Sequence, residues 1–253
     1  MELDRKRLDA IILVLFFIAS TFLIMILRLN HLYSTFLYLV VPSIYLLLKY
    51  KNIRKKILIF VLPFGLVGSL LVEYFAEYNK AWVTSSSTLK LLTYVPLESI
   101  IWGLGYGAIV LTVYKIFLDF KHHPAANNYN YNWLIILSFC AFLALGIWIF
   151  LGPPEIDYAY AKFFGLPTVL ILLYVIHKKP NLGPKFLELS IIFLMFSIIY
   201  EIIALKLGFW WFPGQYYTLV NIAGVGIPIE EVVLWIALGA PLVAAFFEAF
   251  NEV

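Results

Sequence analysis

Charged residues and cysteine are both scarce in this chain. Of its 253 residues, 13% are charged and 63% are hydrophobic, whereas water-soluble domains usually carry about a quarter charged residues. Cys140 is the single cysteine, which excludes an intrachain disulfide and a cysteine metal cluster. The net charge is +3, but the basic residues lie between apolar segments as topology signals do. A nucleic-acid partner is therefore not expected.

Several chemistries lack the residues that they need. No aspartates are clustered as D-x-x-x-D, which excludes a magnesium–diphosphate prenyltransferase, and no lysine lies in mid-membrane to form a retinal Schiff base. The four histidines fall at expected helix ends or loops, so neither a metal site nor a cofactor is expected. The segment "GLGYG" lacks the spacing of a dinucleotide fingerprint. Its Gly103 and Gly107 are typical of a close contact between membrane helices.

Apolar segments recur along the chain. A run such as "AIILVLFFIASTFLIMILRL" reaches the length of about 20 residues that a membrane helix needs. The first such run is too long for a signal peptide and has no cleavage site, so we expect it to remain as a helix. The sequence predicts an all-α polytopic membrane protein with about eight spanning helices, at 9–28, 34–49, 57–77, 94–117, 132–151, 159–177, 186–206 and 227–248.

The distribution of basic residues predicts how these helices are oriented. Cytoplasmic loops carry an excess of lysine and arginine. With the N-terminus inside, five of the 18 basic residues fall on the outer side, namely Arg28, Lys80, Lys90, Lys162 and Lys206. All the others fall on the inner side. We therefore expect a multi-pass protein of the cell membrane with both termini in the cytoplasm.

The two halves of the sequence share a pattern. Glu73 precedes Trp82 by nine residues, and Glu201 precedes Trp210 by the same spacing. Each tryptophan is followed by a proline and a glutamate at an expected helix start, in "YVPLESIIW" and then in "GIPIEEVVL". Apolar sequences align easily, so chance is one explanation. The other is an internal duplication.

A duplication would divide the chain into two repeats, 1–125 and 126–253. Each repeat would hold four helices. An even number of helices returns the chain to its starting side, so the tandem repeats would have the same orientation in the membrane. Such parallel repeats are related by a pseudo-two-fold axis along the membrane normal.

Five of the 15 acidic residues lie in or beside apolar helices, toward the outer side: Glu73, Glu98, Glu201, Glu230 and Glu231. The other ten fall at helix ends, tails or loops, where we expect them to be solvated. Acids in a first helical turn are stabilised by the helix dipole, which would explain three of the five. It does not explain Glu73 and Glu201, which lie near C-terminal helix ends. Because intramembrane acids commonly serve function, we expect all five to converge on one cavity as catalytic groups.

Aromatic side chains accompany these acids in sequence, and six are candidates for substrate binding: Trp82, Trp102, Trp210, Trp235, Tyr74 and Tyr200. One interpretation is the aromatic belt found at membrane interfaces. The other is functional, because the π faces of aromatic rings stabilise cations and pack against a polyene. The sequence leaves both interpretations open.

The repeated acid, tryptophan and Pro-[Leu/Ile]-Glu pattern resembles the membrane-integral lycopene cyclases. These occur as two-subunit enzymes in some bacteria and as fused tandem proteins in archaea and fungi. The resemblance covers both halves and implies a fused, cofactor-free lycopene β-cyclase. Such an enzyme takes lycopene or another acyclic carotenoid from the lipid bilayer and forms γ-carotene and β-carotene. One position departs from the repeat, because Ser99 stands where the second half has Glu231.

Two other functions fit the same residues. A proton-coupled transporter of a small hydrophobic or cationic solute would also use tandem repeats and membrane acids. The clustering of the acids toward one side argues against a proton relay across the bilayer. A carotenoid-binding or scaffold protein without catalytic activity is the third alternative.

Overall fold

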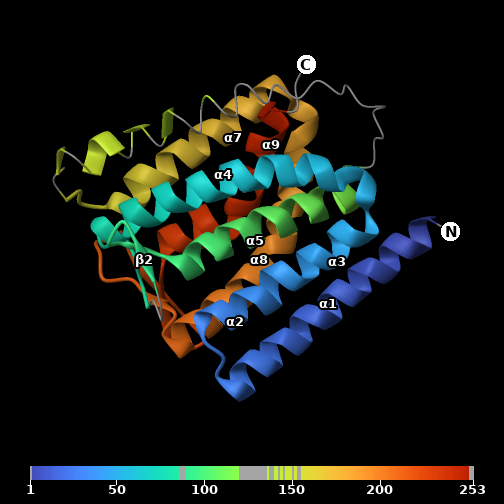
Figure 1. The fold of residues 1–253 in the computed structure, drawn as a ribbon, viewed down its shortest axis with the longest axis horizontal. Coiled ribbons are helices and arrows are strands. Elements are labelled where there is room, and N and C mark those ends of the chain that lie inside the picture. Colours follow the sequence, from blue (N-terminus) through green and yellow to red (C-terminus); the bar gives the residue numbers. More distant parts are fainter. Residues whose placement is uncertain are drawn as a thin grey trace.

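The computed structural model of the protein is mostly helical (Figure 1). It describes residues 2–85, 89–119, 136, 140–141, 143–144, 146–149, 151–152 and 155–250. The α-helices are α1 (Glu2–Leu27), α2 (His31–Thr35), α3 (Val41–Lys49), α4 (Lys51–Tyr78), α5 (Leu97–Val113), α7 (Leu166–Lys178), α8 (Gly183–Leu207) and α9 (Gly239–Phe250).

Short helices of other pitch continue several of these elements. Four are π-helical, namely η1 (Phe36–Val40), η2 (Tyr114–Leu118), η3 (Tyr160–Gly165) and η5 (Glu231–Ala237), and the 3₁₀ turn η4 covers Pro180–Leu182. π-helical turns inside longer helices are often found at functional sites.

Six short strands lie together at one end of the bundle: β1 (Val83–Thr84), β2 (Lys90–Leu91), β3 (Val95–Pro96), β4 (Trp210–Trp211), β5 (Leu219–Ile222) and β6 (Val225–Pro228) (Figure 1). They form three antiparallel pairs, β1 with β4, β2 with β3 and β5 with β6. The β1–β4 pair joins segments from the two halves of the chain.

The helices are long and apolar enough to confirm a multi-pass membrane protein. Within the described residues, six helices could each cross a membrane, and η5 with α9 would make a seventh if the bent pair is one span. These seven correspond to expected segments. The remaining expected segment, 132–151, lies largely outside the described residues and stays a prediction.

The last segment differs from the single helix expected over 227–248. Pro228 is paired in a strand, and the helix that follows is broken by a bend of 47° between η5 and α9. Pro241 has no backbone N–H to donate within the helix, which is a common cause of kinks. Gly239 at the bend allows close packing, because a Cβ there would lie 3.1 Å from the Tyr106 hydroxyl.

The closest approach between α4 and α5 depends on small residues. A Cβ added to Gly103 would lie 1.8 Å from Ser69 Oγ, so only glycine fits without moving that side chain. A Cβ on Gly65 would lie 3.1 Å from the Leu104 side chain. The prediction that "GLGYG" marks a close helix contact is confirmed at Gly103.

Three acids that were expected to be solvated are instead buried, so that part of the sequence interpretation is wrong: Asp9, Glu77 and Glu248. Asp9 accepts hydrogen bonds from the hydroxyl groups of Tyr45 at 2.7 Å and Tyr50 at 2.6 Å. Groups from neighbouring helices reach Asp9 and Glu248, and groups from β1 and β2 reach Glu77, so that protein partners replace water. A helix-end position in sequence therefore did not imply exposure.

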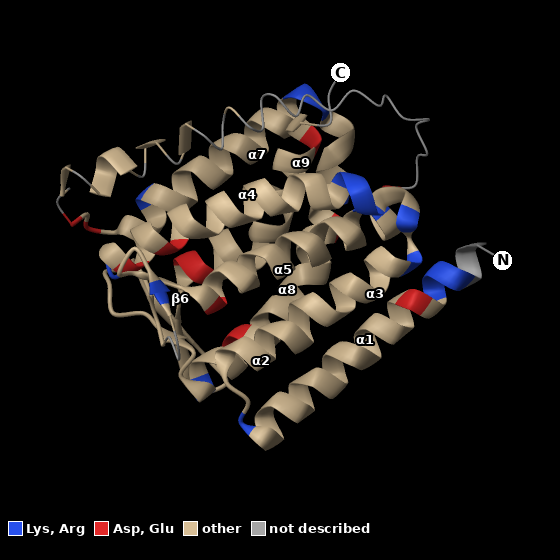
Figure 2. Ribbon diagram, in the orientation of Figure 1, with Lys and Arg blue, Asp and Glu red and all other residues tan. Residues whose placement is uncertain are grey.

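Basic residues gather at the end of the bundle opposite the strands (Figure 2). There Lys185 donates to Asp119 at 2.8 Å, and Lys115 contacts both Asp119 and Glu248. Burial raises the pKa of Asp119, but hydrogen bonds from Lys115 and Lys185 outweigh it and hold that pKa below its usual range. The ionised cluster therefore stabilises the fold at neutral pH, and this stabilisation is lost as the pH falls through the lowered pKa.

Asp119 and Glu155 lie at opposite ends of the helix bundle. Asp119 belongs to the basic end, whereas Glu155 forms an ion pair with Lys80 at 3.0 Å, close to the strands. Near the two termini, Asp9 contacts Lys49 and Glu248 contacts Lys115, so both terminal helices reach the basic end.

We expect both termini to lie on the same, cytoplasmic side of the membrane. Reporter fusions at the two termini should give the same sidedness, and an epitope inserted at the exposed Asp157 should give the opposite one. Termini on opposite sides would contradict the structure, in which both terminal helices reach the basic end of the bundle.

Candidate functional site

A cavity of about 330 Å³ lies between α4, α5 and the bent pair η5–α9. Most of its lining is apolar or aromatic. Phe60 and Glu73, both on α4, line it, and the helix between them extends over about 20 Å. Three carboxyl groups, those of Glu73, Glu201 and Glu231, also line it. The part of the cavity around these three is named the carboxyl end.

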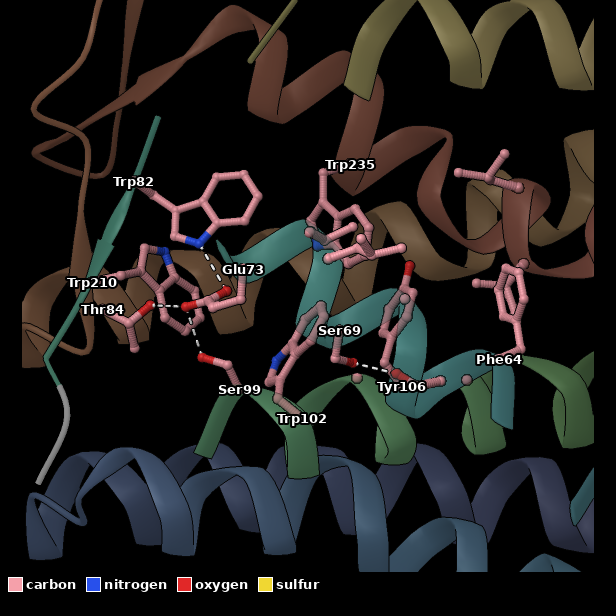
Figure 3. Close-up of a pocket in the computed structure, with 18 of the residues that line it drawn as sticks. Phe64, Ser69, Glu73, Trp82, Thr84, Ser99, Trp102, Tyr106, Trp210 and Trp235 are labelled. Carbon is pink, nitrogen blue, oxygen red and sulfur yellow. Dashed lines mark hydrogen bonds between the residues drawn. The ribbon is translucent and has the colours of Figure 1, made fainter. Parts of the chain in front are cut away.

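Glu73 is held at the carboxyl end by three hydrogen-bond donors (Figure 3). Its Oε2 accepts from Trp82 Nε1–H at 3.1 Å. Its Oε1 accepts from the hydroxyl groups of Thr84 at 2.7 Å and Ser99 at 2.8 Å. Three donors directed at one carboxyl group match the acceptor capacity of its ionised form.

Glu77 positions one of these donors. Its Oε1 accepts from the backbone N–H of Thr84 at 2.6 Å, and its Oε2 forms an ion pair with Lys90 at 2.9 Å. Thr84 is thus fixed by its backbone to Glu77 and by its hydroxyl to Glu73.

Glu201 and Glu231 have fewer partners than Glu73. Glu201 Oε1 accepts from Trp210 Nε1–H at 2.7 Å, and Glu231 Oε2 accepts from the Tyr160 hydroxyl at 2.5 Å. The two carboxyl groups are close enough to interact electrostatically. At the carboxyl end, three hydrogen-bond donors therefore take the place of water around Glu73, whereas Glu201 and Glu231 form a pair of interacting acids.

The pairing of β1 with β4 brings the two tryptophan donors together. Val83 pairs with Trp211 and Thr84 pairs with Trp210. Trp82 and Trp210 are thereby held on neighbouring segments while they donate to carboxyls on α4 and α8 respectively.

The five expected carboxyls do not all line the cavity. Glu98 is 1% exposed and Glu230 is 5% exposed, but neither forms part of the cavity wall. Glu230 Oε1 accepts from the backbone N–H of Tyr217 at 2.7 Å, which ties the loop before β5 to the start of the last helix. Convergence on one cavity is thus seen for three of the five.

The four expected tryptophans, Trp82, Trp102, Trp210 and Trp235, all line the cavity. The Trp102 ring lies 5.2 Å from the Trp235 ring and stacks on the Tyr106 ring at 5.0 Å (Figure 3).

The two expected tyrosines lie elsewhere. Tyr74 packs against Tyr78 and Tyr94. Tyr200 contacts the Thr35 hydroxyl at 3.3 Å and lines a second cavity of about 30 Å³.

The sequence interpretation missed five polar residues that line the cavity, namely His31, Ser69, Thr84, Tyr106 and Tyr160. His31 was assigned to a helix end and set aside; it does begin α2, but it is buried. Thr84 lies two residues after Trp82, so the repeat could have drawn attention to it. No spacing in the sequence relates Tyr160 to Glu231.

The described residues offer no group of three or more His, Cys, Asp or Glu side chains placed to hold a metal ion. What the carboxyl end offers is acid and base groups in a largely apolar, aromatic cavity. Such a site can give and take protons where water is scarce.

We expect the loss of the Trp210 donor to destabilise the protein more than the loss of the Trp82 donor. Trp82→Phe leaves Glu73 with two hydroxyl donors, whereas Trp210→Phe removes the one hydrogen bond that Glu201 receives among the described residues. A buried polar group left without a partner costs about 1–3 kcal/mol. Thermal unfolding of both variants in detergent measures the difference; equal midpoints would contradict it.

Comparisons with family models, curated proteins and solved structures found no match to this chain. Its function must therefore be inferred from the cavity and the side chains that line it.

Proposed function

We propose that the protein is a lycopene β-cyclase, which closes the ψ end groups of an acyclic carotenoid into β-rings. One observation carries the proposal: Glu73, Glu201 and Glu231 meet beside four tryptophans at one end of a long, largely apolar cavity among membrane helices. The family resemblance of the repeated sequence pattern points to the same activity.

The cavity suits a linear apolar substrate. Its wall extends for about 20 Å along α4, from Phe60 to Glu73, and is mostly apolar or aromatic. A polyene placed along it would have one end group among the carboxyls and the rest of its chain against rings such as Phe64 and Phe246. The substrate would enter from the bilayer, where carotenoids dissolve.

Glu201 and Glu231 are the proposed acid. Two carboxyl groups that repel one another in apolar surroundings are not both ionised at low cost, so such a pair retains a proton. That proton adds to the terminal double bond of the substrate and leaves a tertiary cation. The neighbouring double bond attacks the cation and closes a six-membered ring, which moves the positive charge into the ring.

Glu73 is the proposed base. Its three donors hold an ionised carboxylate in place, and that carboxylate stabilises the cation and then takes a proton from the ring. One proton is added and one is removed, so the reaction has no net redox change and needs no cofactor.

The tryptophans complete the site. Their π faces stabilise developing positive charge without offering a nucleophile to it. Trp102 and Trp235, in contact with each other at 5.2 Å, line the cavity on the α5 and η5 sides. An aromatic lining also displaces water, which would otherwise trap the cation as an alcohol.

The strand pairing supports an internal duplication with repeats 1–125 and 126–253. Trp211 follows Val83 by 128 positions, the same offset that separates Glu73 from Glu201 and Trp82 from Trp210. An antiparallel pair in which a residue faces its own equivalent is what a two-fold axis between the repeats requires. Because the chain ends both reach the basic end of the bundle, we place that axis along the membrane normal with both termini in the cytoplasm.

The departure at Ser99 fits one asymmetric site. Ser99 donates to Glu73, whereas the corresponding Glu231 interacts with Glu201, the equivalent of Glu73. Replacement of a hydroxyl donor by a second acid converts a stabilised carboxylate into an acid pair. The first repeat would thus supply the base and the second the acid.

Expression in a lycopene-accumulating host tests the proposal directly. We expect chromatography to show γ-carotene and β-carotene with the wild type. A product heavier by one water would mean that water traps the cation and that the protein is a hydratase. Unchanged lycopene, together with proton-linked solute movement in vesicles, would favour the transporter instead.

We expect Glu231→Gln to lower ring formation by about 10² to 10⁴-fold, because glutamine keeps the size and hydrogen bonding of the side chain but cannot deliver a proton. Glu188→Gln is the matched control, since Glu188 is exposed on α8. Both proteins should accumulate in the membrane to wild-type levels. Near-normal conversion by Glu231→Gln would exclude proton transfer by this residue.

A further inference from the structure

His31 is a buried titratable residue that the proposed reaction does not use. It begins α2, at the end of the bundle where the strands lie (Figure 1), and its side chain lines the cavity. The residue is 5% exposed. It therefore faces the inside of the site and not the membrane surface.

Both ring nitrogens of His31 lack a hydrogen-bond partner among the described residues. A neutral imidazole has one N–H donor and one acceptor, and leaving either unsatisfied in a buried position costs about 1–3 kcal/mol. Buried polar groups of this kind in native proteins generally have an explanation in a bound water, a ligand or a catalytic role. Because the side chain of His31 lines the cavity, a molecule held there can supply this partner, and a hydrocarbon substrate supplies no polar atom.

The surroundings of His31 fix its ring but leave its nitrogens available. The ring stacks on Phe209 at 5.4 Å and meets the edge of Trp210 at 5.4 Å, and Trp210 in turn donates to Glu201. His31 also interacts electrostatically with the buried Glu98 on α5. Burial disfavours the charged form of this imidazole, and a negative charge at Glu98 offsets part of that cost when the ring carries a second proton.

Each turnover of the proposed reaction leaves the carboxyl groups of the site in protonation states that do not support the next turnover. The acid pair, Glu201 and Glu231, has lost a proton to the substrate, and Glu73 has gained one from the ring. A second turnover requires a proton to reach the pair and another to leave Glu73. Imidazole performs such exchange well, because it accepts a proton at one nitrogen while it releases one from the other.

We propose that His31, with a water held at its free nitrogens, is the proton-exchange residue that resets this site between turnovers. This inference rests on the proposed cyclase function. His31 takes a proton through that water and passes one on toward the acid pair, while Glu98 balances its transient charge. Proton number is conserved, since the proton gained by Glu73 returns to water.

Two substitutions separate proton exchange from packing. His31→Phe keeps an aromatic ring against Phe209 and Trp210 but has no nitrogen, and His31→Ala leaves a space that added imidazole can fill. His177→Phe is the matched control, because His177 is exposed at the end of α7. Conversion of lycopene by isolated membranes, with and without imidazole in the buffer, is the measurement.

We expect His31→Phe to slow ring formation by roughly 10²-fold, a typical loss for a proton-transfer group, while His177→Phe has no effect. Imidazole should restore most of the activity of His31→Ala and none of that of His31→Phe. If His31→Phe does not accumulate, the rescue of His31→Ala decides the question.

Wild-type activity in His31→Phe would overturn the inference, as would His31→Ala that imidazole does not rescue. These outcomes leave the cyclase assignment intact, because the wild type still forms rings in the same assay. A wild type that leaves lycopene unchanged would overturn the cyclase assignment and the role of His31 together.

Discussion

The pairing of β1 with β4 is the constraint on which the site depends. It joins the loop after α4 to the loop after α8, so that Trp82 and Trp210 are held side by side. Each indole donates to a carboxyl on the helix that precedes its own strand. Together with the hydrogen bonds from Ser85 to the backbone carbonyls of Gly208 and Phe209, this pairing holds the two loops against each other beside the carboxyls of Glu73 and Glu201.

Burial of several carboxyls in a membrane protein is costly unless each has partners. The site meets this requirement unevenly. Glu73 receives three hydrogen bonds, whereas Glu201 and Glu231 receive one each from Trp210 and Tyr160 among the described residues. In the proposed reaction, this uneven supply gives chemically similar groups different roles, with a stabilised carboxylate at Glu73 and a proton-retaining pair at Glu201 and Glu231.

Much of the fold could be predicted from the sequence because the apolar segments are long and carry few charged residues. The helices at α1, α4, α5 and α8 follow segments that the sequence marks clearly. The bend before α9 was not predicted, although Pro241 lies inside the expected helix 227–248, where a proline commonly causes a kink. The burial of Asp9 was missed because its tyrosine partners lie some forty positions away, a contact that only the tertiary structure reveals.

In the site, too, local sequence patterns could be recognised in advance, whereas contacts between distant segments could not. Glu73, Glu201, Trp82 and Trp210 could be selected by their repeated spacing, which reflects the local geometry of helix and strand. Trp102 and Trp235 could be selected because they lie close to the acids in sequence. Tyr160 and His31 could not be selected from the sequence, because their roles arise from packing between elements distant in sequence. Glu98 and Glu230 share the sequence pattern but do not line the cavity, and Glu230 instead accepts a hydrogen bond from the backbone N–H of Tyr217.

The most direct test of the account is an experimental structure of the protein with lycopene bound. The account predicts that one ψ end group lies between Glu73 and the pair formed by Glu201 and Glu231, with the polyene running along α4 toward Phe60. Lycopene bound only on an outer, lipid-facing surface, with the carboxyl end empty or filled by a polar solute, would contradict it.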